Sequence, residues 1–199
     1  MLDFNKIKTI SIKQRKNKVR LSDLIKPQDS KILVNSKDFN KLIKKIIIAY
    51  KNKKQIILMM GAHVIKVGMS LLIIDLMKKG IVKHIAMNGA GPIHDFELAL
   101  IGETSEYVEN TIEDGTFGMI EETGKILNEA IKEGAKNSYG MGYSIGKKIN
   151  DLNLKNKECS ILYNAYKLNI PVTVHVAIGT DIIHQHPSCD GAAVGKTSY

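Results

Sequence analysis

A chain of 199 residues with 44% apolar residues can build a sizeable core, which excludes a disordered protein. The charged N-terminus has no apolar signal region and no window approaches the roughly 20 apolar residues of a membrane span, so we expect a cytoplasmic protein without membrane contact. Cys159 and Cys189 lie far apart, which excludes a disulfide framework and a cysteine-based zinc site.

The net charge of +9 is unevenly distributed. Residues 1–54 hold 16 Lys and Arg against 4 Asp and Glu, which gives +12, and residues 55–199 hold 13 against 16, which gives −3. The lysines of this basic N-terminal segment are dispersed through an amphipathic pattern and are not interleaved with a cluster of aromatic residues that would stack on bases. The pattern favours a solvated helix face over a nucleic-acid site, and it leaves an acidic partner open.

The elements alternate between helix and strand along the chain. The spacing in "DFNKLIKKIIIAYKNKK" predicts an amphipathic helix from near Asp38, and "QIILMM" predicts a strand covered on both faces. The segment "GAHVIKVG" follows as a loop, "MSLLIIDLMKKG" as a buried helix that ends at Gly80, and "IVKHIAM" as a second strand. Helices are expected to fill most of residues 93–168, and Pro171 precedes a third strand, "VTVHVAIG".

This order predicts an α/β fold, a Rossmann-like parallel sheet with flanking helices, in a single domain over residues 1–199. Each strand runs into a cluster of glycines and polar residues, at residues 61–68, 88–95 and 179–190. Ligands of open parallel sheets bind beyond the carboxyl ends of the strands. We therefore expect the three loops to form one cleft.

Several residues in these loops allow more than one interpretation. The two glycines of "GAGPIH" suit either a tight turn or close approach of the backbone to a phosphate at a helix N-terminus. His184 and His186 resemble a pair of metal ligands, although they precede a proline in a loop, so hydrogen bonds to a substrate or cofactor are an alternative. Asp181 and Asp190 are explained by turn chemistry or by contacts with ribose hydroxyls or an amine.

Two segments together carry a resemblance to a known family: "MMGAHVIKVGMSLLIIDLMKKGIVKHIAMNGAGPIHDF" and "IPVTVHVAIGTDIIHQHPSCDGAAVG". The chain resembles the deoxyhypusine synthase family over roughly residues 8–199, and most closely its bacterial deoxyhypusine synthase-like branch. The resemblance implies a homotetramer that binds NAD and oxidises spermidine or a related amine. An aminobutyl group then passes through an imine on an enzyme lysine to a lysine of a translation factor, forming the precursor of hypusine, or to a second small amine.

The resemblance also assigns residues of this chain to ligands. The first NAD loop of the family falls on residues 62–66 and the second on residues 88–90, which together comprise Ala62, His63, Val64, Ile65, Lys66, Asn88, Gly89 and Ala90. A further aspartate that contacts NAD falls on Asp181 or, less closely, on Asp190. We assign Asp181 to the cofactor and Asp190, with His94 and Asp95, to the substrate.

Two departures from the family pattern bear on activity. The family places two adjacent glutamates, which hold cationic amines, where this chain has Ile93 and His94. We therefore expect weak binding of spermidine, and a preference for an amine with fewer charges or with an anionic group that a protonated His94 would meet. The family's catalytic lysine lies in a segment beyond Tyr199, so no residue here is assigned to that role.

Three hypotheses follow from the sequence. The first is an NAD-dependent alkylamine transferase of the deoxyhypusine synthase type. The second is a non-catalytic NAD-binding or scaffolding homologue. The third is a metal-dependent hydrolase that uses His184 and His186, although neither residue is assigned here as a metal ligand.

Overall fold

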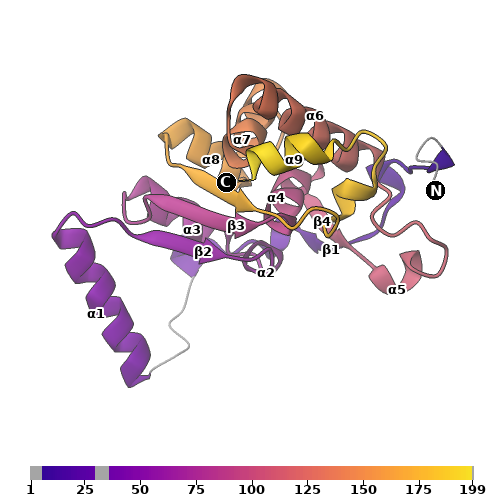
Figure 1. Cartoon of the computed structure of the whole chain (residues 1–199). Coiled ribbons are helices and arrows are strands. Elements are labelled where there is room, and N and C mark those ends of the chain that lie inside the picture. The colour runs from indigo at the N-terminus through magenta and orange to yellow at the C-terminus, as the bar shows by residue number, and fades with distance from the viewer. Residues whose placement is uncertain (1–5, 30–35, 199) are drawn as a thin grey trace.

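The computed structural model describes residues 6–29 and 36–198. Three strands form a parallel sheet in the order β2-β3-β5, and a second sheet pairs β1 with β4 antiparallel. The strands are β1 Asn17–Arg20, β2 Ile57–Met60, β3 His84–Asn88, β4 Glu103–Glu106 and β5 Val172–His175. The mixed α/β architecture with a parallel sheet and flanking helices confirms the predicted fold class (Figure 1).

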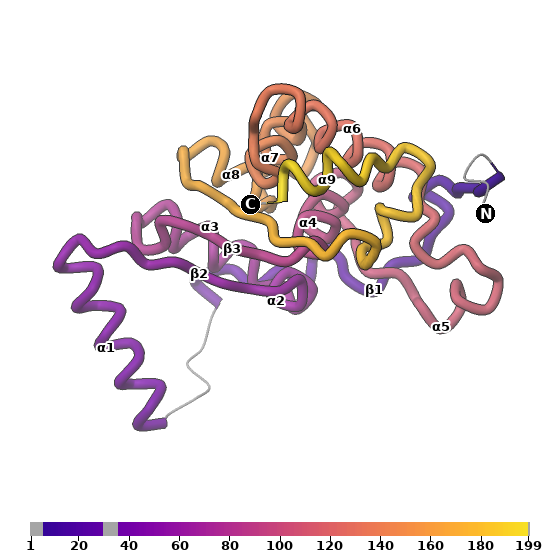
Figure 2. The backbone as a smooth tube through the Cα atoms, in the orientation of Figure 1, coloured from indigo at the N-terminus to yellow at the C-terminus, as the bar shows by residue number. Residues whose placement is uncertain are grey.

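Helices connect these strands and pack mainly with one another. Their bounds are α1 Lys37–Lys51, α2 His63–Lys66, α3 Ser70–Lys78, α4 Ala90–Ile101, α5 Val108–Thr111, α6 Glu121–Asn137, α7 Met141–Asp151, α8 Ile161–Leu168 and α9 Gly191–Thr197. Figure 2 shows α9 running beside α6, and α7 packs on α8. None of the helices in the described part of the chain has both the length and the apolar character that a membrane span requires.

The parallel sheet has one buried face. Leu58 and Met60 of β2 lie in register with Ile85 and Met87 of β3, which in turn pair with β5. These side chains belong to or pack against the main apolar core, together with residues of α3, α4, α6, α7 and α8. The helices that cross between successive strands therefore cover this face.

The opposite face of the sheet is open among the described residues. Ile57 and Met59 of β2 point to it and are 57% and 79% exposed. The prediction that this strand is covered on both faces is therefore wrong. Its physical reason is the strand order: β2 lies at the edge of the sheet, and the described helices pack on the other side.

The predicted amphipathic helix of the basic segment is confirmed as α1. It begins after Ser36, whose side chain accepts a hydrogen bond from the Phe39 backbone N–H at 3.1 Å and so caps the first turn. None of its residues is buried, and α1 projects from the rest of the molecule in Figure 1. Its apolar stripe, which includes Leu42 and Ile47, is consequently exposed.

Other predicted elements differ in detail. The segment expected to be a loop after the first strand contains one helical turn, α2. The helix expected to end at Gly80 is α3, and Gly80 has the positive φ of 65° that favours glycine after a helix. The polar strand β4 was not predicted, and it interrupts the helical region 93–168.

Candidate functional site

A cavity of about 230 Å³ lies at the carboxyl edge of the parallel sheet. Lys66 comes from the end of α2, which follows β2, while Ala90 and His94 come from α4, which follows β3. Residues 180–182 close the cavity after β5. The other lining residues are Arg15, Ile93, Glu97, Ser105, Glu106, Val108 and Phe117. The three loops expected to form one cleft thus each contribute to one cavity.

An ion pair forms the buried end of this cavity. Arg15 Nη2 lies 2.7 Å from Glu97 Oε2, and the two side chains are 2% and 1% exposed. Glu97 also accepts hydrogen bonds from Thr104 Oγ1 at 2.6 Å and from Thr123 Oγ1 at 2.9 Å. Both oxygens of this carboxylate therefore accept hydrogen bonds within the protein. The pair of Arg15 and Glu97 forms a rigid part of the cavity lining.

Glu106 is the second buried carboxylate of the cavity. Its Oε1 accepts a hydrogen bond from the Gly118 backbone N–H at 3.1 Å and lies 4.0 Å from Arg15 Nη1. Its Oε2 is buried and has no hydrogen-bond partner among the described residues. Burial raises the pKa of Glu106, and the nearby guanidinium of Arg15 opposes that rise. The Thr111 hydroxyl also contributes a hydrogen bond to this carboxylate, and Oε2 has almost no accessible surface, so Oε2 is not open to a ligand.

The backbone next to Glu106 is strained. Ser105 is a non-glycine residue of β4 with a φ of 67°, and its side chain is buried and lines the cavity. Residues held in this left-handed region cost free energy and are concentrated at functional sites. The strain at Ser105 therefore agrees with a ligand site at this position.

His94 lines the cavity in an uncharged state. Its Nδ1 lies 2.7 Å from Thr104 Oγ1. Burial lowers the pKa of His94 to about 4, against a smaller opposite effect of Glu97. His94 is therefore uncharged near neutral pH. This disagrees with the expectation that a protonated His94 meets an anionic group of the substrate.

Asp181 and Gly89 approach each other closely at the same edge. A Cβ atom placed on Gly89 would lie 1.8 Å from Asp181 Oδ2, so only glycine allows this approach. Burial raises the pKa of Asp181, and His184 partly offsets that effect. Asp181 is thus a partly desolvated carboxylate beside the start of α4.

The start of α4 offers some of the groups that a dinucleotide needs. Gly89 precedes the 12-residue helix α4, and no side chain caps the first turn, which leaves backbone N–H groups for a phosphate. The carboxylate of Asp181 would repel a phosphate beside it but can accept hydrogen bonds from ribose hydroxyls. The cavity is smaller than the 300 Å³ or so usual for a whole ligand, so it would hold only part of a dinucleotide.

The predicted first cofactor loop divides between surface and core. His63 is exposed and Val64 is half-buried, whereas Ala62 is buried and Ile65 is fully buried in the main core. The side chain of Ile65 therefore cannot meet a ligand. Of this loop, Lys66 is the residue that lines the cavity.

Asp95 does not face the cavity, which corrects the expectation that it binds substrate. It is fully buried and accepts hydrogen bonds from Ser160 Oγ at 2.5 Å and from the backbone N–H groups of Ile161 at 2.8 Å and Leu162 at 3.0 Å. These contacts cap α8, since its first N–H groups have no partners within the helix. Asp95 therefore has a structural role.

Asp190 is likewise a helix cap and lies outside the cavity. Its Oδ1 accepts hydrogen bonds from the backbone N–H groups of Ala192 at 2.9 Å and Ala193 at 3.1 Å at the start of α9. The sequence left open which of the two aspartates contacts a cofactor, and the structure places them at different sites. Asp181 lines the cavity, and Asp190 lies in a shallow surface depression beside α6.

His184 and His186 have separate structural partners. His184 Nδ1 accepts hydrogen bonds from the backbone N–H groups of Gly179 at 3.1 Å and Asp181 at 3.2 Å. His186 instead contacts Ser188 Oγ at 2.7 Å and Glu121 Oε2 at 3.2 Å. Within residues 6–29 and 36–198, no group of three His, Cys, Asp or Glu side chains is placed to hold a metal ion. The metal-dependent hydrolase hypothesis therefore has no ligand set in that part of the chain.

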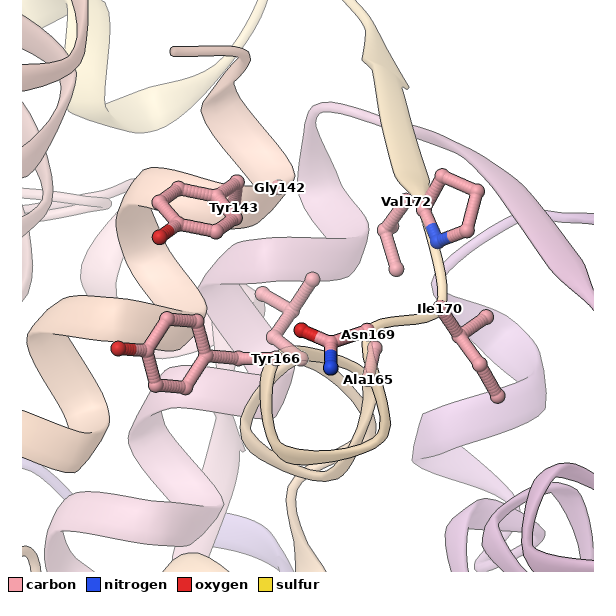
Figure 3. Close-up of a pocket in the computed structure, with 9 residues that line it drawn as sticks. Gly142, Tyr143, Ala165, Tyr166, Asn169, Ile170 and Val172 are labelled. Atoms are coloured by element: carbon pink, nitrogen blue, oxygen red, sulfur yellow. The ribbon is translucent and has the colours of Figure 1, made fainter. Parts of the chain in front are cut away.

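A second cavity of about 270 Å³ lies near the amino end of β5. Figure 3 shows the rings of Tyr143 and Tyr166 on one side of it and Ile170 and Val172 on the other. No Lys, Arg, His, Asp or Glu side chain lines it. A cavity of this composition cannot neutralise a phosphate or a cationic amine, so it is a weaker candidate than the cavity that Lys66 and Asp181 line.

The polar lining residues that lie outside the three predicted loops were missed by sequence reasoning: Arg15, Glu97, Ser105 and Glu106. Arg15 was counted with the solvated basic segment. A signal was present in "DFELALI", where one glutamate stands among apolar residues of a buried helix, because a buried carboxylate requires a cation or several donors.

No family model and no curated protein matches the chain in sequence. The solved structures that resemble it include the following two. One is the apo structure of ArgZ, an arginine dihydrolase from the ornithine–ammonia cycle in cyanobacteria, with a TM-score of 0.46 and 16% identity over 73% of this chain. The other is a LOR/SDH protein from Methanococcus maripaludis S2, with a TM-score of 0.45 and 19% identity over 79% of this chain. The matches span 19% and 46% of the lengths of those proteins.

Proposed function

We propose that this chain belongs to an NAD-dependent transferase of the deoxyhypusine synthase type, which acts on spermidine or a related amine. The supporting observation is that Lys66, Ala90, His94 and Asp181 line one cavity at the carboxyl edge of a parallel sheet. The sequence resemblance assigns each of them to a ligand.

The charges of the cavity support an amine with few positive charges. Arg15 and Lys66 provide two cations against the three carboxylates of Glu97, Glu106 and Asp181, a balance of −1 with His94 neutral. One carboxylate, Glu97, is already bound to Arg15. The apolar side chains of Val108 and Phe117 are suited to a hydrocarbon chain. This lining favours a monoamine over a polyamine.

The test is to titrate the protein with NAD in a calorimeter, and then to add butylamine or spermidine and follow NADH absorbance. We expect NAD to bind, and butylamine to give a larger absorbance rise than spermidine. NAD binding without any amine-dependent NADH would instead favour the non-catalytic homologue. Absence of NAD binding to a folded protein would contradict both hypotheses.

Replacing Gly89 by valine is expected to weaken NAD binding at least tenfold. The added side chain would collide with Asp181 Oδ2 and with Val176 Cγ1, which lies 2.7 Å from the Cβ position, and would block approach of the backbone to the cofactor. The matched control is Gly191→Val, because the nearest atom to a Cβ there is Ile178 Cγ2 at 3.9 Å. Equal NAD affinity of the two folded variants would contradict the site.

We also propose that the chain forms a homo-oligomer, the tetramer that the family resemblance implies. The open face of the parallel sheet and the exposed apolar stripe of α1 support self-association, since large apolar patches on a surface mark interfaces. Light scattering at micromolar concentration is expected to report an oligomer that a Leu42→Ser, Ile47→Ser variant dissociates. The control is Ile112→Ser, because Ile112 is an exposed apolar residue that lies outside α1. A monomeric wild-type protein would contradict the proposal.

A further inference from the structure

The uncharged cavity near the amino end of β5 lies between α7, α8 and β5. The charged cavity is lined by residues that follow β2, β3 and β5, so the two cavities lie at opposite edges of the parallel sheet. The lining of the uncharged cavity is Gly142 and Tyr143 of α7, Leu162, Ala165 and Tyr166 of α8, and Asn169, Ile170, Pro171 and Val172. The proposed transferase makes no use of this cavity.

Two close backbone contacts fix the position of α7 beside the uncharged cavity. A Cβ atom on Gly142 would lie 2.2 Å from the carbonyl oxygen of Val172, so only glycine lets α7 approach β5 this closely. A Cβ atom on Gly146 would lie 2.5 Å from the carbonyl oxygen of Leu162 on α8. Helix α7 therefore packs backbone to backbone on both neighbours. The walls of the cavity are in place before a ligand binds, which lowers the cost of ordering them on binding.

Two tyrosine rings form one wall of this cavity. The ring centres of Tyr143 and Tyr166 are 5.3 Å apart in an edge-to-face arrangement, and Tyr139 lies 4.8 Å from Tyr143 on the surface. Figure 3 shows the hydroxyl groups of Tyr143 and Tyr166 pointing away from Val172, so the rings themselves face the cavity. Aromatic rings prefer offset-stacked or edge-to-face neighbours. A planar aromatic ligand can therefore extend this cluster of rings.

The amide of Asn169 gives the cavity one unused polar group. No hydrogen bond of the described residues involves this amide, and Figure 3 shows it pointing toward the tyrosine rings. Asn169 ends α8 with a φ of 53°, a conformation in which glycine would serve as well. The backbone therefore does not require an amide here. An amide both donates and accepts hydrogen bonds, so it suits a hydroxyl, N–H or carbonyl group of a ligand.

We propose that this cavity binds a small uncharged aromatic compound with one hydrogen-bonding group, such as a phenol or an indole. The ring packs on Tyr143 and Tyr166, and the polar group meets the Asn169 amide. No Lys, Arg, His, Asp or Glu side chain lines the cavity, so a charged ligand would lose its hydration without gaining a partner. The volume of about 270 Å³ lies just below the roughly 300–1,000 Å³ of most ligand pockets, which suits one or two rings.

The first experiment uses indole as its own reporter. The chain contains no tryptophan, so indole emission can be separated from the emission of the protein. Adding protein to indole is expected to give a saturable blue shift, because the indole ring leaves water for an apolar cavity. Unlabelled p-cresol is expected to reverse the shift, whereas benzoate and benzylammonium leave it unchanged. A folded protein that gives no saturable shift, or displacement by benzoate as effective as that by p-cresol, would overturn the inference.

The second experiment fills the cavity. Ala165 lines it from α8, so the larger side chain of Ala165→Leu occupies the space that a ligand needs. This variant is expected to lose the indole shift. The control is Ala135→Leu, which enlarges a helical alanine of α6 outside the cavity and is expected to bind indole like the wild type. Circular dichroism checks that both variants fold. Wild-type affinity in folded Ala165→Leu would place indole elsewhere and reject the cavity.

The third experiment tests the polar contact without disturbing the fold. Asn169→Gly keeps a residue that adopts a positive φ and removes only the amide, and it is expected to weaken indole binding roughly fivefold through loss of one hydrogen bond. The matched control is Asn153→Gly, since Asn153 has a φ of 48° after α7 and lies outside the cavity. Equal indole affinity of the two variants would contradict the assigned contact. None of these measurements requires NAD or an amine, so their outcome is independent of the proposed transferase.

Discussion

The Arg15→Leu variant is expected to lose about 3–5 kcal/mol of unfolding free energy. Arg15 is the cation that compensates Glu97, and Glu106 is near it, so its removal leaves buried carboxylates without their cation. The measurement is urea denaturation followed by circular dichroism. Adding Glu97→Gln to the variant is expected to recover part of the loss, because the second change removes the uncompensated charge.

The control for this prediction is Arg20→Leu. Arg20 lies 3.7 Å from Glu103, but its side chain is 68% exposed, and exposed ion pairs contribute about 1 kcal/mol or less. If Arg15→Leu and Arg20→Leu lose similar amounts of unfolding free energy, the buried pair of Arg15 and Glu97 does not stabilise the fold more than an exposed pair does.

Asp95→Ala is expected to destabilise the fold by about 3 kcal/mol through loss of the α8 cap, since several buried donors lose their acceptor. Those donors are the Ser160 hydroxyl and the backbone N–H groups of Ile161 and Leu162. The control Asp190→Ala removes an exposed cap of α9 and is expected to cost about 1 kcal/mol. If Asp95→Ala has normal stability but binds amines poorly, Asp95 binds substrate and the structural role is wrong.

The same residue gives a pH signature. Burial raises the pKa of Asp95 to about 6, from 3.8 in the unfolded chain. The stabilisation that comes from this shift is therefore present below pH 3.8 and is lost as pH rises through about 6. The lowered pKa of His94 acts in the opposite direction. Its contribution to the free energy of unfolding is present above the unfolded pKa of 6.5 and is lost as pH falls toward the folded pKa of about 4. Asp95→Asn removes the first effect, so its stability is expected to fall more steeply than the wild type between pH 6 and 4.

The sequence allowed prediction of those parts of the fold that local patterns determine. The helices α1, α3 and α6 and the three parallel strands follow from apolar spacing over short windows, and the ligand loops follow from the position of glycines after strands. The convergence of Lys66, Ala90, His94 and Asp181 follows from the rule that parallel strands end at one edge.

The remaining features depend on contacts between distant segments. Strand β4 is polar and pairs with the distant strand β1, with Asn17 opposite Glu106 and Arg20 opposite Glu103. Neither strand has a local apolar pattern, so neither could be found from a short window of the sequence. A capping aspartate and a substrate-binding aspartate look alike in sequence, which is why Asp95 was assigned wrongly. The open face of β2 could not be foreseen because its apolar run is that of a fully covered strand.

That open face has a chemical consequence. Met59 is 79% exposed on it, whereas Met87 on the neighbouring strand faces the core and is 2% exposed. Peroxide should convert Met59 to its sulfoxide long before Met87, because oxidation of methionine requires access of the oxidant to sulfur. The ratio of the two oxidation rates, read by mass spectrometry, therefore reports whether another polypeptide covers the sheet in solution. A cell extract that slows oxidation of Met59 alone would place the covering surface on β2.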